Sequence, residues 1–379
     1  MPNTWRKTVL SSIVPTRSDV VAEQKMIRVL IRKIKQMKGV HVDVKLAGSL
    51  ARNTHLRGDR DLDIFVFYDP KVKREAFEKA GLKLGHAVFG KSFHEEAYSE
   101  HPYVRGEIDG FNVEVVPTYK VDKASNKISA VDRTPFHAAY MKKNLSMRQC
   151  NEVRLLKQFF KSVHVYGADV RFQGVPGYLV EILILKYKTF EKAVEAMSHW
   201  RDHAVVDLER AHGNDSIALV QFNHPHLLVV DPTDASRNVA GALSYNQFAR
   251  LILACRAFVK KPSEKFFSSA HQKSLSPAQL KSYLDKEALF GVHIPYPHDM
   301  LSDVMWGQLH RLSTKLTNTL EQHSFKILRT WYWTNAKTDA FIIFDVENQV
   351  LEQSMLRMGP KVTEEKHAEM FLAAHPRPL

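Results

Sequence analysis

The segment 45–68 constrains the fold of this chain more than any other. It reads Lys-Leu-Ala-Gly-Ser-Leu-Ala-Arg-Asn-Thr-His-Leu-Arg-Gly-Asp-Arg-Asp-Leu-Asp-Ile-Phe-Val-Phe-Tyr, an alternating stretch, a Gly-Ser turn and an apolar stretch that opens with Asp61 and Asp63. Residues two apart on a strand share a face, so the two carboxylates can converge while the intervening apolar residues face the core. A small-residue turn beside paired carboxylates is typical of metal-dependent phosphoryl or nucleotidyl transfer.

Composition bounds the domain count and the class of partner. The 379 residues exceed one core, so two or three domains are expected. If the net charge of +13 lies on one face, it predicts a polyanionic partner such as nucleic acid. Two cysteines, Cys150 and Cys255, are too few for a disulfide framework, and we expect a cytoplasmic protein without signal peptide or membrane span.

Hydrophobic periodicity divides the chain into three regions. The first combines helices and strands, the second is mainly helical, and the third has the β-α-β-β order of a ferredoxin-like or RNA-recognition-type unit with one open sheet face. The first region has helices at 17–38 and 71–86 and strands at 40–47, 61–68 and about 104–117. The second has helices at 150–163, 177–198 and 244–260. The third has strands at 288–294, 325–333 and 341–346 around a helix at 303–322.

Two further features have competing interpretations. Glu114 lies between valines on an apolar strand, so it faces away from their side, either as an exposed acid or as a third carboxylate beside Asp61 and Asp63. In the third region, Trp331 and Trp333 can stack RNA bases on an open sheet or belong to the core. We favour the core for both tryptophans.

A series of strings in the order of the chain resembles the archaeal, class I, CCA-adding enzymes, which are tRNA nucleotidyltransferases of the DNA polymerase β-type superfamily. The general signature is Gly-Ser, acid-x-acid and a later acid. The more specific strings are Ala-Gly-Ser-Leu-Ala-Arg-Asn-Thr (47–54), Glu-His-Pro-Tyr-Val (100–104), Val-Glu-Val-Val-Pro-Thr-Tyr (113–119), Ser-Ala-Val-Asp-Arg-Thr-Pro-Phe-His (129–137), Asn-Glu-Val-Arg-Leu-Leu-Lys (151–157), Val-Tyr-Gly-Ala (165–168), Gly-Tyr-Leu-Val-Glu (177–181), Val-Val-Asp-Pro-Thr-Asp-Ala-Ser-Arg-Asn-Val-Ala (229–240) and Arg-Met-Gly-Pro (357–360).

The resemblance implies an α+β multidomain enzyme: a mixed-sheet nucleotidyltransferase head (1–136), a helical neck that recognises the base (137–262) and an RRM-like, tRNA-binding body (263–379). It implies template-independent addition of C, C and A to the 3′ end of tRNA from CTP and ATP, with two Mg²⁺ ions. The tRNA would be held by its acceptor stem and T-arm, and a homodimer is compatible with the family. The chain stops about twenty residues after the Arg-Met-Gly-Pro string, so we expect the tail module to be largely absent.

The resemblance also assigns site residues. Asp61, Asp63 and Glu114 would bind the metal ions. Contacts to the nucleotide would come from Ser49, Arg52, His101, Thr134, His137, Lys157, Tyr166 and Arg237, of which Arg237 would read the base. Each has a structural alternative: Lys157 can be an exposed helix residue, and Arg237 can pair with Asp231 or Asp234.

One departure from the family and two rival functions stay open. The third metal ligand is usually Asp, and Glu114 must shift the metal or the backbone to keep Mg²⁺ octahedral. The rival enzyme is a poly(A)-polymerase-like or oligoadenylate-synthetase-like transferase that uses ATP alone. The rival of another class is a non-catalytic RNA-binding module.

Overall fold

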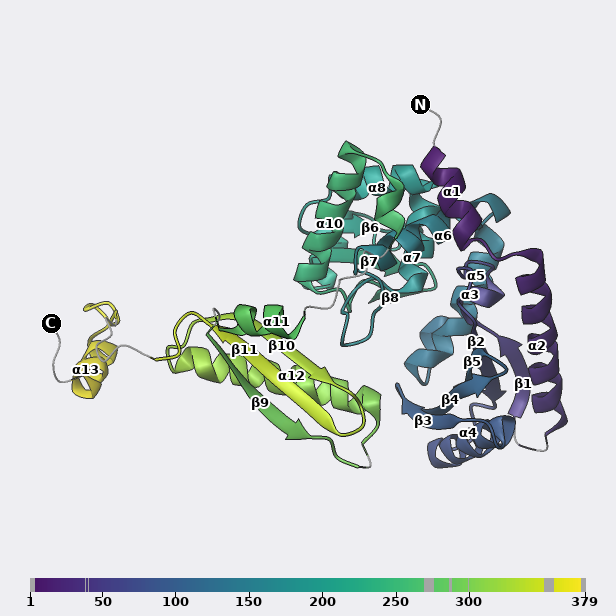
Figure 1. Ribbon diagram of the computed structural model, residues 1–379, viewed down its shortest axis with the longest axis horizontal. Coiled ribbons are helices and arrows are strands. Elements are labelled where there is room, and N and C mark those ends of the chain that lie inside the picture. Colours follow the sequence, from purple (N-terminus) through teal and green to yellow (C-terminus); the bar gives the residue numbers. More distant parts are fainter. Residues whose placement is uncertain are drawn as a thin grey trace. The chain divides into compact units, whose positions relative to one another are not determined.

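The computed structural model describes residues 4–37, 39, 41–268, 276–285, 288–298, 300–350 and 358–375. Backbone contacts divide the chain into two compact units (Figure 1). The first comprises residues 1–274 with 296–310 and 336–338, and the second comprises residues 275–295, 311–335 and 339–379. None of the helices in the described part of the chain has the length and apolar character needed to span a bilayer.

A five-stranded mixed sheet forms the head, in the order β1-β2-β5-β4-β3. Its strands are β1 (His41–Leu46), β2 (Asp61–Tyr68), β3 (His94–Tyr98), β4 (Pro102–Ile108) and β5 (Phe111–Tyr119). β2 and β5 are parallel, and the other pairs are antiparallel. The stretch expected as one strand at about 104–117 is a hairpin of β4 and β5 that turns at Asp109 and Gly110, both at positive φ.

One face of this sheet is covered by helices α2 (Arg17–Gln36) and α4 (Arg74–Phe89). Leu62 and Ile64 of β2 and Val113 of β5 are fully buried there against Leu30 and other residues of α2 and α4. Strand alternation therefore points Asp61, Asp63 and Glu114 to the opposite face, as the sequence predicted. Val42 of β1 is exposed, at the point where the register with β2 shifts between His41 and Asp43.

The neck is mainly helical. Helix α1 (Thr4–Ile13), which lies in the range expected for the head, packs in the core of the neck through Trp5, Val9 and Ile13. The other helices of the neck are α5 (Thr134–Asn144), α6 (Met147–Ser162), α7 (Gly177–Tyr187), α8 (Phe190–Ser198), α9 (Asp215–Gln221) and α10 (Tyr245–Lys260). The apolar run 177–198 was expected to be one helix, but it breaks at Lys188, whose φ is +73°. A small sheet of β6 (Ala204–Val206), β7 (Leu227–Asp231) and β8 (Asp234–Asn238) interrupts the helices, and the sequence patterns did not predict it.

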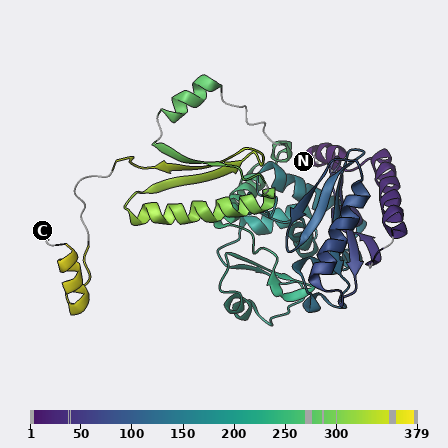
Figure 2. The same cartoon turned by 90° about the horizontal axis from the view of Figure 1, so that it is seen from below.

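The split β-α-β-β arrangement that the sequence predicted has its three strands in the second unit, together with residues 311–322 of its helix. Strands β9 (Leu289–Pro295), β10 (Ile327–Thr334) and β11 (Asp339–Val346) form an antiparallel sheet with β11 in the middle. Helix α12 (Ser302–Gln322) runs along one face of this sheet (Figure 2). Two shorter helices, α11 (Pro277–Leu284) and α13 (Glu365–Ala374), were not predicted.

The prediction that Trp331 and Trp333 belong to the core is wrong. Their exposed fractions are 43% and 51%. Thr330 of β10 hydrogen-bonds Thr317 of α12 at 3.1 Å, so the helix covers the face of Thr330 and alternation sends both tryptophans to the other face. Arg329 lies over the ring of Trp331, 5.1 Å from its centroid.

Candidate active site

Three carboxylates lie on adjacent strands of the head sheet. Asp61 and Asp63 are both on β2, and Glu114 is the direct cross-strand neighbour of Asp63 on β5. Asp61 is exposed, whereas Asp63 and Glu114 are half-buried. Glu114 is therefore not the isolated outer-face acid of the alternative interpretation, because it belongs to this acidic group.

The electrostatics of the three acids favour a cation. Burial, followed by the charge of Asp61, raises the pKa of Asp63 to about 6. Burial, followed by the charge of Asp63, raises the pKa of Glu114 to about 7. Among the described residues, neither side chain accepts a hydrogen bond, so no donor offsets the repulsion between them. A divalent cation with oxygen ligands would remove that repulsion.

The three carboxylates lie on adjacent strands but do not converge on one point. In the part of the chain that the structure describes, no three acidic, histidine or cysteine side chains enclose a point where a metal ion would fit. Asp61 accepts a hydrogen bond of 2.9 Å from Asn112 Nδ2, which turns its carboxylate toward β5. Asp61 is exposed and lies on the same face of β2 as Asp63, so a rotation of its side chain would give three carboxylates that suit a metal ion.

The Gly-Ser turn lies directly against Asp63. Gly48 begins the short helix α3 (Gly48–Ala51) with a φ of +66°, and a Cβ atom at this position would lie 1.7 Å from Asp63 Oδ2. The turn is tied to β2 by a hydrogen bond of 2.8 Å from Ala47 N to Asp63 O. Only glycine combines this backbone conformation with so close an approach, and the half-buried Ser49 follows it next to the acids.

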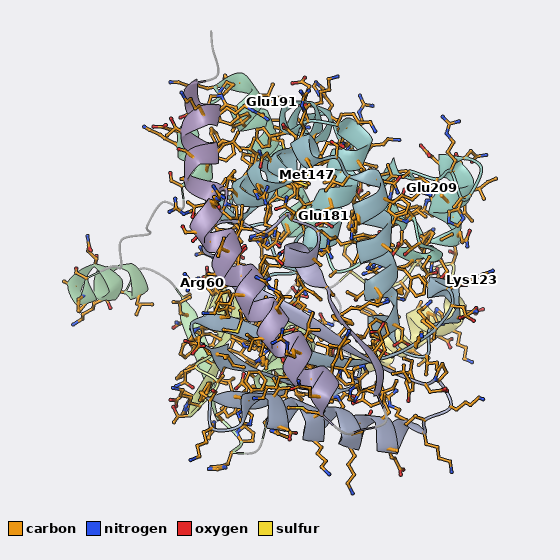
Figure 3. All side chains as sticks on the ribbon, turned by 90° about the vertical axis from the view of Figure 1, so that its right-hand side faces the viewer. Arg60, Lys123, Met147, Glu181, Glu191 and Glu209 are labelled. Atoms are coloured by element: carbon orange, nitrogen blue, oxygen red, sulfur yellow. The ribbon has the colours of Figure 1, made fainter. Side chains whose placement is uncertain are left out.

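Two cations and a tyrosine extend the site toward the neck. Arg52 follows α3 and pairs with Glu181 of α7, which Figure 3 labels; its Nε lies 2.9 Å from Glu181 Oε1. Lys157 of α6 is buried, and burial lowers the pKa of its ammonium group to about 8. Its Nζ lies 5.8 Å from the ring centroid of Tyr166, a side chain whose pKa is raised by burial. Lys157 is therefore not the exposed helix residue of the alternative interpretation.

A buried aspartate of the neck joins His137 and Arg237. Asp231 Oδ2 accepts hydrogen bonds from His137 Nε2 at 2.8 Å and from Arg237 Nη1 at 2.9 Å. Burial alone would raise the pKa of Asp231, but the hydrogen bonds from His137, Thr233 and Arg237 hold it well below its usual range. The pairing of Arg237 with Asp231 was one of the two structural alternatives. It leaves the rest of the half-buried guanidinium accessible.

The two groups of residues belong to one site. Tyr178 of α7 stacks on His137 with 3.9 Å between ring centroids, and its hydroxyl donates to Asp231 Oδ1 at 3.3 Å. Glu181, three residues later on the same helix, accepts the hydrogen bond from Arg52, so α7 connects the two groups. The site extends from the sheet carboxylates to the Asp231 cluster.

One of the expected nucleotide contacts, His101, has other surroundings. His101 is 1% exposed, and its ring packs edge-on against Phe77 of α4, 5.1 Å between centroids. The structure therefore does not bring His101 to the carboxylates. Thr134 is the half-buried first residue of α5, the helix that also carries His137.

The sequence interpretation missed Glu181 and gave Asp231 only a structural role. Each joins side chains distant along the chain: Glu181 binds Arg52 and Thr54, and Asp231 binds His137. Both lie inside strings that carried the resemblance, 177–181 and 229–240. An acid in an otherwise apolar segment was the available signal for both.

Three family models match the chain in succession. They are the nucleotidyltransferase domain at residues 27–137, the second domain of tRNA nucleotidyltransferase at 151–268 and the C-terminal domain of the CCA-adding enzyme at 287–378. Solved structures show the fold of the catalytic part. The Cid1 poly(U) polymerase has a TM-score of 0.57 with 13% identity, over 70% of this chain and 98% of that chain. A cytoplasmic RNA terminal U-transferase has a TM-score of 0.53 with 13% identity over the same shares.

Curated relatives match over most of the chain. The CCA-adding enzyme of Methanothermobacter thermautotrophicus is 35% identical over 90% of this chain and 74% of its own length. The CCA-adding enzyme of Methanocaldococcus jannaschii is 35% identical over 97% of this chain and 82% of its own length. The CCA-adding enzyme of Halobacterium salinarum is 38% identical over 88% of this chain and 71% of its own length. The mixed-sheet head, the neck and the C-terminal domain occur in the same order as the matching models. The chain belongs to the family of CCA-adding enzymes.

Proposed function

We propose that the chain adds C, C and A to the 3′ end of tRNA from CTP and ATP without a nucleic-acid template. The proposal rests on the arrangement in which Asp63 lies directly opposite Glu114 on the neighbouring strand and Gly48 lies against Asp63. The relatives of the chain are CCA-adding enzymes. In the reaction, the 3′-hydroxyl of the RNA attacks the α-phosphate of the nucleotide in line, and pyrophosphate leaves.

Asp61, Asp63 and Glu114 would hold two Mg²⁺ ions, which supply charge stabilisation and lower the pKa of the attacking hydroxyl. The carboxylates must be ionised for this role. The raised pKa values of Asp63 and Glu114 mean that cation binding is coupled to loss of protons. Glu114 would take part from β5, where it lies directly opposite Asp63 of β2.

The remaining residues of the site bind the nucleotide. The triphosphate would be bound by Ser49 and the cations Arg52 and Lys157. Lys157 is a buried cation, and the charge of Arg52 acts on Asp63, so both cations would interact strongly with an anion at this site. Arg237 is suited to a base edge, because Asp231 fixes one Nη and leaves the rest of the planar guanidinium accessible. His137, held by the same aspartate and stacked on Tyr178 at 3.9 Å, forms the wall beside it.

Product sequencing tests the proposal most directly. Transcripts of tRNA that end before, within and after the CCA sequence are incubated with CTP, ATP and Mg²⁺. The expected products all end in CCA, and the complete substrate is not extended. Products extended by A alone would favour the ATP-only transferase.

The variant Asp61→Asn separates catalysis from binding. We expect it to reduce incorporation by at least about 1000-fold while tRNA affinity stays within about threefold, because the change removes one charge from the metal-binding group. Wild-type protein that binds tRNA without any metal-dependent incorporation would instead support a binding module.

A further inference from the structure

A buried ion pair joins the head to the neck within the first unit. The side chains of Arg52 and Glu181 are 8% and 2% exposed. Arg52 Nε donates a hydrogen bond of 2.9 Å to Glu181 Oε1. Glu181 Oε2 lies 2.8 Å from the same nitrogen but has no hydrogen-bond partner, since the geometry of the N–H group favours Oε1.

The geometry leaves one end of the guanidinium free. A paired arginine commonly presents two N–H groups to a carboxylate, whereas Glu181 receives only the Nε–H of Arg52. Within the described ranges, neither Nη group of Arg52 has a hydrogen-bond partner, and neither is a fully buried atom. Both Nη groups therefore reach accessible space, and Arg52 ends the short helix α3, whose first residue, Gly48, lies against Asp63.

Glu181 is also held by a hydrogen bond from the segment that follows α3. Thr54 Oγ1 donates to Glu181 Oε1 at 2.5 Å, and the backbone N–H of Thr54 donates to Ser49 O at 2.9 Å. The carboxylate thus connects α7 with Arg52 and with the segment that contains Ser49. A buried charge that is hydrogen-bonded on two sides has little freedom to rotate.

We infer that Glu181 is a positioning residue of the nucleotide site, which holds Arg52 by Nε so that both Nη groups face the triphosphate. The inference rests on the proposed function, because it assumes that Arg52 binds phosphate. Glu181 touches no substrate. It fixes the direction of the arginine before the nucleotide arrives, and so removes the cost of ordering that side chain on binding.

The test is the steady-state kinetics of Glu181→Gln with full-length protein and a tRNA that ends before CCA. We expect KM for CTP to rise on the order of 10- to 100-fold, the value of a hydrogen bond to a charged group, while kcat and KM for tRNA stay within about threefold. The control is Glu23→Gln. Glu23 is a second buried glutamate, paired with His55 at 3.2 Å, and its variant should leave KM for CTP unchanged.

A double-mutant cycle separates positioning from general destabilisation. In the background of Arg52→Gln, the change Glu181→Gln should alter KM by less than about twofold, because no guanidinium is left to position. An unchanged KM in the single variant, an equal rise in the Arg52→Gln background, or an equal rise in Glu23→Gln would each overturn the inference.

A second variant covers the case that Glu181→Gln does not fold. Thr54→Val keeps the shape of the side chain and removes one hydrogen bond to Glu181, so KM for CTP should rise about two- to tenfold. An unchanged KM in a folded Thr54→Val protein would then overturn the inference. A wild-type protein that incorporates neither nucleotide would refute the proposed function instead.

Discussion

Replacing Gly48 by alanine tests how closely the turn and the carboxylates depend on each other. The new Cβ would lie 1.7 Å from Asp63 Oδ2, and contacts of this kind below 3.0 Å are essentially never observed. The carboxylate of Asp63 must therefore move by more than about 1 Å. Alanine also has to adopt a φ of +66°, which costs about 1–2 kcal/mol of stability.

The two effects should appear in different measurements. A misplacement of about 1 Å in a reacting group can reduce a rate about 100-fold, so incorporation of CMP by Gly48→Ala should fall by about that factor or more. The free energy of unfolding, measured by urea denaturation, should fall by about 1–2 kcal/mol because a side-chain oxygen can move away. The protein should stay folded while its activity is largely lost.

Gly58→Ala is the matched control. Gly58 has a φ of +87°, and a Cβ there would meet nothing within 4 Å. This variant should show a similar loss of stability, with incorporation within about threefold of the wild type. A Gly48→Ala enzyme that keeps more than a tenth of its rate would refute the reasoning. So would a Gly58→Ala enzyme that loses as much activity as Gly48→Ala.

Three further predictions follow from burial and charge. Burial lowers the pKa of Lys157 to about 8, so its charge is lost above that pH. In a pH series, kcat/KM for CTP should therefore fall above about pH 8 in the wild type and stay level in Lys157→Arg. Trp331→Ala and Trp333→Ala should each lower the free energy of unfolding by less than about 1 kcal/mol, whereas the buried Phe344→Ala should cost about 3–5 kcal/mol by urea denaturation. Asp231→Asn should raise KM for both nucleotides by about tenfold or more, because Asp231 fixes two side chains of the site; unchanged values for both would contradict this.

The sequence predicted the features that depend on local periodicity. The acids share a face of the head sheet because alternation along one strand is independent of the rest of the fold. The same rule put Trp331 and Trp333 on one face of β10, but it did not reveal which face α12 covers. That depends on how the helix packs on the sheet, and here it packs on the face of Thr330.

Glu181 and Asp231 were harder to predict than the strand carboxylates, because the residues that they bind lie far away in the chain. Glu181 lies 127 residues from Thr54, and Asp231 lies 94 residues from His137. No spacing rule relates such positions; only the packed neck brings them together. A single acid in an apolar segment is an ambiguous signal, because it can be exposed, paired or functional.

The segment that follows the Gly-Ser turn contacts the neck as well as the head. Arg154 of α6 donates from Nε to His55 O at 2.8 Å and from Nη2 to Asn53 Oδ1 at 2.7 Å. Farther along the same segment, Lys161 of α6 pairs with Asp59 at 2.9 Å.

Side chains of the neck thus hold the segment between α3 and β2 at Asn53, His55 and Asp59. The head sheet has its own core with α2 and α4. The direction of Arg52 and the path of the segment instead depend on contacts with the neck. The proposed nucleotide site is therefore formed by the head and the neck together, and changes in α6 or α7 should affect nucleotide binding before they affect the sheet.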